Sequence, residues 1–126
     1  MIEITDRTIA ANGLIAGLAT TLSGSVVSHV GIVRPPGGNK RLVSIRYEAD
    51  DQAARQDLSL IEAEIRQTWP IEDIVLSFRT GDLDVGDAIL AVAVSAPHSA
   101  DAFQACSQGV DRIRTLPSRR KTEVHA

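Results

Sequence analysis

Cysteine and aromatic residues are scarce in this chain. Cys106 is the only cysteine among the 126 residues, so no internal disulfide can form and a zinc site built from several thiolates is excluded. Aromatic residues make up 3% of the chain, which leaves too few rings for the stacking platforms that bind single-stranded nucleic acid. The core must therefore be built from Val, Ile, Leu and Ala, and Cys106 is expected to be a small buried residue within it.

The chain also lacks a long apolar run and an excess of positive charge. No segment approaches the ~20 apolar residues of a membrane span, and no basic stretch precedes an apolar one at the N-terminus, so we expect no signal peptide. The formal net charge of -3 and the pI near 5.5 argue against a general attraction to nucleic acid. We therefore expect a cytoplasmic protein in which residues 1–126 form a single domain.

Hydrophobic periodicity predicts strands that are distributed along the whole chain. The strand over 88–95 is apolar on both faces, which is typical of a central strand. Gly31 predicts a bulge or a close approach, and the Gly/Pro-rich segment 35–40 predicts a loop, as does 80–87. The strands are expected over 2–5, 25–33, 42–47, 74–78 and 88–95.

Three helices are predicted between these strands. A short helix is expected within 8–21, and a longer one should start at Asp50 or Asp51 as N-cap and stop at Pro70. The third is expected over 98–115, with a buried face made of Ala102, Phe103, Cys106, Val110 and Ile113. Helices and strands in mixed order, packed on one sheet, give an α+β or α/β domain.

His98 and Arg34 stand where predicted strands end. His98 lies at a strand-to-helix junction and is the first candidate for an acid–base group, since histidine titrates near neutrality; the alternative is a histidine that caps or packs at the helix start. Arg34 lies where a strand breaks into a loop, a position from which a scaffold presents functional side chains; the alternative is a solvated arginine. His29 and His125 have no partner at metal-ligand spacing, so we expect no metal.

A group of basic residues follows the third predicted helix on an otherwise acidic chain, which favours a small anionic ligand. Arginine binds phosphate in a bidentate manner and keeps its proton, whereas lysine can act as a base or nucleophile. Lys121 is therefore the member of the group suited to proton transfer or covalent chemistry. A solvated basic tail is the alternative. The group consists of Arg112, Arg114, Arg119, Arg120 and Lys121, and Lys40 and Arg41 could join it.

Several segments resemble one known family. Residues 25–34, Ser-Val-Val-Ser-His-Val-Gly-Ile-Val-Arg, resemble the strand that ends in the G-x-V-R motif of the molybdopterin synthase large (catalytic) subunit family. Tyr47-Glu48-Ala49 is similar to the Y-E-A-Y turn of that family, and residues 79–87 are similar to its H-R-x-G-x-L-x-x-G-E segment.

The C-terminal third carries the strongest part of this resemblance. Val94-Ser95-Ala96-Pro97-His98, followed by Ala102-Phe103, matches the V-S-A-P-H-R-x-x-A-F signature. Asp111 matches the acidic residue of the last helix, and Lys121-x-Glu123 matches the closing K-K/R-E. The match runs from about Leu14 to Glu123.

The resemblance implies a fold and a reaction. The fold would be α+β of the α/β hammerhead type: a mixed or antiparallel sheet with packed helices plus a small antiparallel β subdomain. Members of the family form a homodimer within a heterotetramer, and each pocket receives the C-terminal Gly-Gly thiocarboxylate of a small ubiquitin-like sulfur carrier. Two sulfurs pass to cyclic pyranopterin monophosphate to give molybdopterin. No cofactor, nucleic acid or membrane is implied.

The resemblance also implies site residues. Lys121 and Arg114 take the catalytic positions. The substrate-binding positions fall on Ile32, Val33, Arg34, His98, Ser99, Arg114, Lys121, Thr122 and Glu123. Two of these positions depart from the family pattern: Ser99 replaces an arginine and Arg114 replaces a lysine. Outside them, Phe78 replaces the histidine before the conserved arginine, and residues 117–121 replace an aromatic P-x-W-K segment.

These departures leave three hypotheses. The first is an active synthase with Lys121 as its reactive amine. The second is a catalytically impaired paralogue that binds the sulfur carrier or a catalytic partner. The third is a stand-alone binder of a small phosphorylated metabolite.

Overall fold

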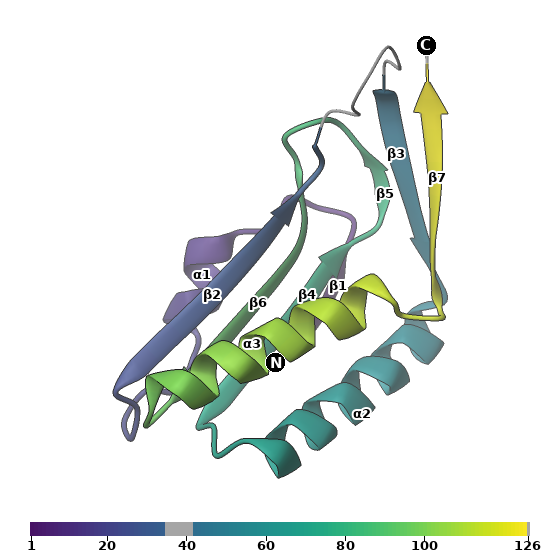
Figure 1. Cartoon of the computed structure of the whole chain (residues 1–126). Helices are drawn as coiled ribbons and strands as arrows, with labels where there is room; N and C mark the ends of the chain where they lie inside the picture. Colours follow the sequence, from purple (N-terminus) through teal and green to yellow (C-terminus); the bar gives the residue numbers. More distant parts are fainter. Residues whose placement is uncertain (35–41, 126) are drawn as a thin grey trace.

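The computed structural model describes residues 1–34 and 42–125, which fold into two sheets and three helices (Figure 1). In spatial order the larger sheet contains β1 (Ile2–Thr5), β4 (Asp73–Arg79), β6 (Ala88–Ala96) and β2 (Ser25–Ile32). The smaller sheet contains β5 (Gly81–Leu83), β3 (Leu42–Ala49) and β7 (Arg119–His125). The helices are α1 (Ala11–Ala16), α2 (Asp51–Thr68) and α3 (Ser99–Arg114).

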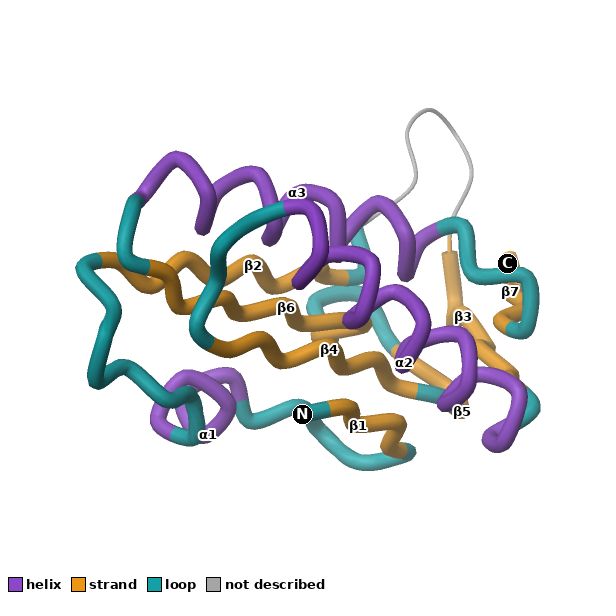
Figure 2. The backbone as a smooth tube through the Cα atoms, turned by 90° about the horizontal axis from the view of Figure 1, so that it is seen from below, coloured by secondary structure: helices purple, strands orange, loops and turns teal. Residues whose placement is uncertain are grey.

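Helices cover both faces of the larger sheet, with α2 and α3 on one face and α1 on the other (Figure 2). β6 is a central strand, as predicted from its apolar residues on both faces. It pairs antiparallel with β2 and β4, whereas β1 joins β4 in parallel. The smaller sheet is antiparallel and lies beside the C-terminal end of α3. The predicted α+β class, with a mixed sheet and a small antiparallel subdomain, is confirmed.

Local sequence signals set the limits of α2. Asp50 is its N-cap and accepts a hydrogen bond from the Ala53 N–H at 2.9 Å, as expected for Asp50 or Asp51. The helix ends just before Pro70. Its buried face contains Ala54, Leu58, Ile61 and Ile65. No helix within the described ranges is long and apolar enough to span a membrane.

The structure corrects three predictions. β5 lies inside the segment 80–87 that was predicted as a loop, because three residues are too few to show a period. β7 occupies the basic C-terminal stretch and is an edge strand, a place where charged residues are common and an apolar pattern is absent. Phe103 was predicted to be buried but is 62% exposed, since it falls beside the buried stripe of α3.

Gly109 brings α3 close to the larger sheet. A Cβ atom at this position would lie 3.0 Å from Val92 Cγ1 and 3.1 Å from Leu76 Cδ2. A side chain here would have to push the helix or those two side chains away. The close approach therefore sets how near α3 lies to β4 and β6.

Glu72 ties the segment before β2 to the start of β4. Its carboxylate accepts hydrogen bonds from Ser23 Oγ at 2.6 Å, from the Leu22 N–H at 2.8 Å and from Thr21 Oγ1 at 3.0 Å. These bonds, the one from Ser23 above all, hold the pKa of Glu72 below its ordinary value.

We expect Glu72→Gln to lower the melting temperature at neutral pH, because an amide accepts these hydrogen bonds less well than a carboxylate. The pKa of Glu72 is lower in the folded state than its ordinary 4.5, so its stabilisation is present above about pH 4.5 and is lost as the pH falls further. The difference in melting temperature between wild type and variant should therefore shrink towards about pH 3. Asp6→Asn, which changes an exposed carboxylate without a hydrogen bond among the described residues, is the control. A difference that stays constant with pH would contradict this role.

Candidate functional site

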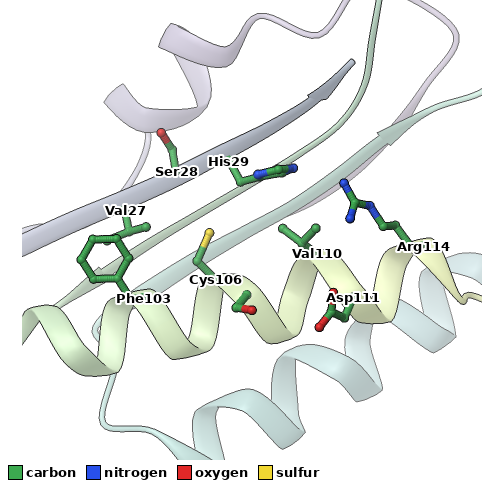
Figure 3. A pocket seen from close by; sticks show the side chains of 9 residues that line it. Val27, Ser28, His29, Phe103, Cys106, Val110, Asp111 and Arg114 are labelled. Atoms are coloured by element: carbon green, nitrogen blue, oxygen red, sulfur yellow. The ribbon is translucent and has the colours of Figure 1, made fainter. Parts of the chain in front are cut away.

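A groove of about 370 Å³ runs between β2 and α3 (Figure 3). Ser28 and His29 line it from the strand, and Phe103, Cys106 and Arg114 are among the residues that line it from the helix. Phe103 is exposed here because it forms part of this wall and not of the core. The groove therefore combines an apolar wall with polar groups near the C-terminal end of α3.

Cys106 is a structural residue of the groove. It is 3% exposed, and its thiol donates a hydrogen bond to the Val92 carbonyl oxygen at 3.7 Å. Burial raises the pKa of the thiol to about 11, so it stays protonated at neutral pH and is a poor nucleophile. The prediction of a small buried cysteine is confirmed.

β2 has a bulge between Gly31 and Ile32, which confirms the irregularity predicted at Gly31. Backbone hydrogen bonds fix the chain just after this bulge. Val33 is 1% exposed; its N–H donates to the Asp87 carbonyl at 2.9 Å, and its own carbonyl accepts from the Gly86 N–H at 2.8 Å. Ile32 and Arg34 flank it with exposed side chains. Of the predicted substrate-binding residues 32–34, Ile32 and Arg34 therefore point to solvent, and the buried Val33 holds the segment in place.

β7 carries the predicted residues Lys121, Thr122 and Glu123. Lys121 lies opposite Tyr47 and Glu123 lies opposite Ile45, so these two side chains share the face of the buried Tyr47 and Ile45. Lys121 Nζ is 2.7 Å from Glu123 Oε1. Thr122 is on the other face of the sheet.

Arg119 links the smaller sheet to the main core. Its guanidinium carbon lies 4.0 Å from the centroid of the Tyr47 ring and 5.6 Å from that of Phe78. Burial lowers the pKa of Arg119, and the positive charge of Arg114 lowers it further. Arg114 is therefore close enough to Arg119 to influence it, which places the C-terminal end of α3 beside the start of β7.

The basic group does not form one patch. Arg112 pairs with Glu64, and Arg120 lies 3.8 Å from Glu48. Arg114 is exposed and forms no ion pair with any of the described residues. Lys40 and Arg41 lie outside the described residues.

His98 and Ser99 lie at the other end of α3. His98 is the N-cap residue, exposed and without a side-chain capping bond, and Ser99 is the first helical residue. Fifteen residues at 1.5 Å each separate Ser99 from Arg114 by roughly 22 Å. The end of β2, the C-terminal end of α3 and β7 thus lie on one side of the molecule, whereas the start of α3, which carries His98 and Ser99, lies on the other (Figure 1).

His29 was predicted neither as a metal ligand nor as a residue of this groove. It lies on β2 with its side chain directed into the groove (Figure 3). The signal that was present is the alternation of β2, in which Val27 and His29 share one face.

The model of the MoaE protein family matches residues 4–116. This chain belongs to the MoaE family. It is 33% identical over 122 residues to the molybdopterin synthase catalytic subunit of Bacillus subtilis. The alignment covers 97% of this chain and 78% of that relative. Family membership gives it a role in molybdopterin biosynthesis.

Solved structures agree with the fold of this MoaE-family chain. Molybdopterin synthase from Staphylococcus aureus aligns with a TM-score of 0.92 and 28% identity, over 98% of this chain and 90% of that one. A complex of subunits 1 and 2 of molybdopterin-converting factor from Helicobacter pylori aligns with a TM-score of 0.78 over 98% of this chain and 84% of that one; at 11% identity this likeness concerns the fold alone.

Proposed function

We propose that this chain is the catalytic subunit of a molybdopterin synthase, which moves sulfur from a thiocarboxylated, ubiquitin-like carrier to cyclic pyranopterin monophosphate. The observation that carries the proposal is the packing of the end of β2 against the smaller sheet. Val33, next to Arg34, shares a buried cluster with Tyr47, which lies opposite Lys121 on β7. Arg114 lines the groove and lies close enough to Arg119 to lower its pKa. Guanidinium groups suit the phosphate of the pterin substrate. The names of the relatives favour an enzyme over a binding subunit without activity.

Lys121 is the member of this trio suited to proton transfer. Arg34 and Arg114 keep their protons throughout the physiological range, whereas a lysine amine can release its proton in the right surroundings. Glu123, which lies 2.7 Å from the amine of Lys121, orients it. Arg114 therefore acts through its charge, and the chemical role falls to Lys121.

A second copy of the chain completes the site in this proposal. His98 and Ser99 lie roughly 22 Å along α3 from Arg114, so they cannot contact the same small substrate as Arg114 of their own chain. A homodimer that places α3 of one copy against the groove of the other brings the two ends together. The sulfur carrier would then bind to each half of a heterotetramer. We place the assembly in the cytoplasm, which fits a chain whose one cysteine is buried and unpaired.

The test is conversion of cyclic pyranopterin monophosphate to molybdopterin by the purified chain with a thiocarboxylated carrier. Turnover is expected, and a mixture of His98→Ala and Lys121→Ala chains should recover activity that neither variant has alone. Carrier binding without turnover by the wild-type chain would refute the enzyme and support the impaired paralogue. Failure of the mixture to recover activity would refute the shared site.

A further inference from the structure

His29 lines the groove and has a ring nitrogen without a hydrogen-bond partner among the described residues. Its Nε2 atom is shielded from solvent and has no hydrogen-bond partner among the described residues. The side chain lines the groove from β2, as Figure 3 shows. A shielded polar atom without a partner costs free energy, and a ligand that bonds to it recovers that cost. A residue on the strand side of the groove therefore carries an unsatisfied polar atom.

The groups that face His29 come from β6 and α3. β6 contributes no titratable side chain, and Val92 lies opposite His29 in the register. α3 contributes Cys106, Asp111 and Arg114, and the thiol of Cys106 is already bonded to a backbone carbonyl. In Figure 3 the guanidinium of Arg114 is directed towards the imidazole, whereas the carboxylate of Asp111 is directed away from it. No other residue of β2 is titratable.

We propose that His29 is the titratable partner of Arg114 in a subsite for an oxyanion, in which the protonated imidazole donates a hydrogen bond from Nε2 to the ligand. Arg114 supplies a permanent charge and His29 supplies one that depends on pH. The subsite therefore needs the charged ring, and its occupancy falls when the ring loses its proton.

The ligand chemistry is that of a phosphate monoester or a carboxylate. Under the proposed function, on which this identification rests, the sources are the phosphate of the pterin substrate and the C-terminal carboxyl group of the carrier. Oxyanion binding itself does not depend on that function. The subsite can therefore be tested apart from turnover.

Sulfate is a suitable probe because it remains a dianion between pH 5 and 8, so any change of affinity across that range reports on the protein. Calorimetric titration of the full chain should show sulfate affinity falling by about 10-fold or more from pH 5 to pH 8, the effect of losing one charged hydrogen bond. His29→Gln should bind sulfate weakly at both pH values. Gln104→Ala, an exposed change on α3 outside the groove lining, should behave as wild type.

A second measurement needs no variant. The ring nitrogens of His29 can be followed by NMR in the wild-type chain, and saturating sulfate should move the titration of His29 to higher pH, because a bound anion stabilises the charged ring. A peptide that ends in Gly-Gly, used in place of sulfate, distinguishes the two ligand sources: the same shift with the peptide assigns the subsite to the carrier.

Two results overturn the proposal. The first is a sulfate affinity that does not differ between wild type and His29→Gln at either pH. The second is an NMR titration of His29 that neither sulfate nor the peptide shifts. Absence of molybdopterin formation, together with sulfate binding that depends on His29, would refute the proposed function and leave the subsite standing.

Discussion

Replacing Lys121 with alanine is expected to lower the rate of sulfur transfer by ~10²–10⁴-fold, the usual size of a positioned acid–base contribution. Arg34 and Arg114 cannot replace its proton chemistry, because arginine keeps its proton. The side chain of Lys121 is 49% exposed, so its removal costs little packing and the melting temperature should hardly change. The measurement is the initial rate of molybdopterin formation with saturating carrier, alongside a thermal melt.

A matched substitution separates charge from proton transfer at this position. Lys121→Arg keeps the positive charge beside Glu123 but does not release a proton, so it should be impaired nearly as much as Lys121→Ala. Arg120→Ala removes the next cation of β7, which lies 3.8 Å from Glu48, and should leave the rate near that of wild type. Wild-type activity in Lys121→Ala would show that another group performs the chemistry, and full activity in Lys121→Arg would reduce the role to electrostatics.

Phe78→Ala should cause the largest loss of stability, about 3–5 kcal/mol, because it removes a large side chain from the centre of the core. Phe78 is fully buried on β4, where it lies opposite Ile4 and Leu90. Its ring also lies beneath the guanidinium of Arg119 at 5.6 Å. The substitution should therefore weaken the main core and the attachment of the smaller sheet together. We expect the melting temperature to fall by about 10–20 °C.

Phe103→Ala is the matched control for this prediction. It removes the same atoms from a side chain that is 62% exposed on α3, so the melting temperature should change little. Phe78→Leu keeps most of the buried volume and should lie between wild type and Phe78→Ala. A loss below about 1 kcal/mol for Phe78→Ala would mean that the site collapses around the missing ring.

The fold could be predicted from the sequence wherever a local pattern reports burial. The doubly apolar β6 and the cap at Asp50 are examples, since each signal lies within a few consecutive residues. β7 could not be predicted in this way, because it is charged and its strand conformation depends on pairing with the distant β3. Phe103 shows a related limit: hydrophobicity alone does not distinguish a core position from the wall of a groove.

The candidate site was predictable in composition but not in arrangement. Motif resemblance predicted Arg34, Arg114 and Lys121 as site residues, and the structure places Arg114 in the groove, Arg34 just after β2 and Lys121 on β7. The same motifs gave no sign that His98 and Ser99 lie at the far end of α3, since sequence distance does not report the direction of a helix. His29 could not be predicted, because its Nε2 atom is recognised as lacking a hydrogen-bond partner only when the neighbouring residues are placed.

The length of α3 sets the distance between the two ends of the helix that the proposed two-copy site uses. The helix carries His98 and Ser99 at its start and Arg114 at its end, so in a two-copy site each helix would serve two pockets at once. Inserting a single residue between these ends would shift one relative to the other by about 1.5 Å and rotate it by about 100°. The residues at the two ends of the helix would then be misplaced in both pockets at once. Exposed residues of this helix outside the groove and its two ends can therefore be exchanged, whereas the number of residues between the ends cannot.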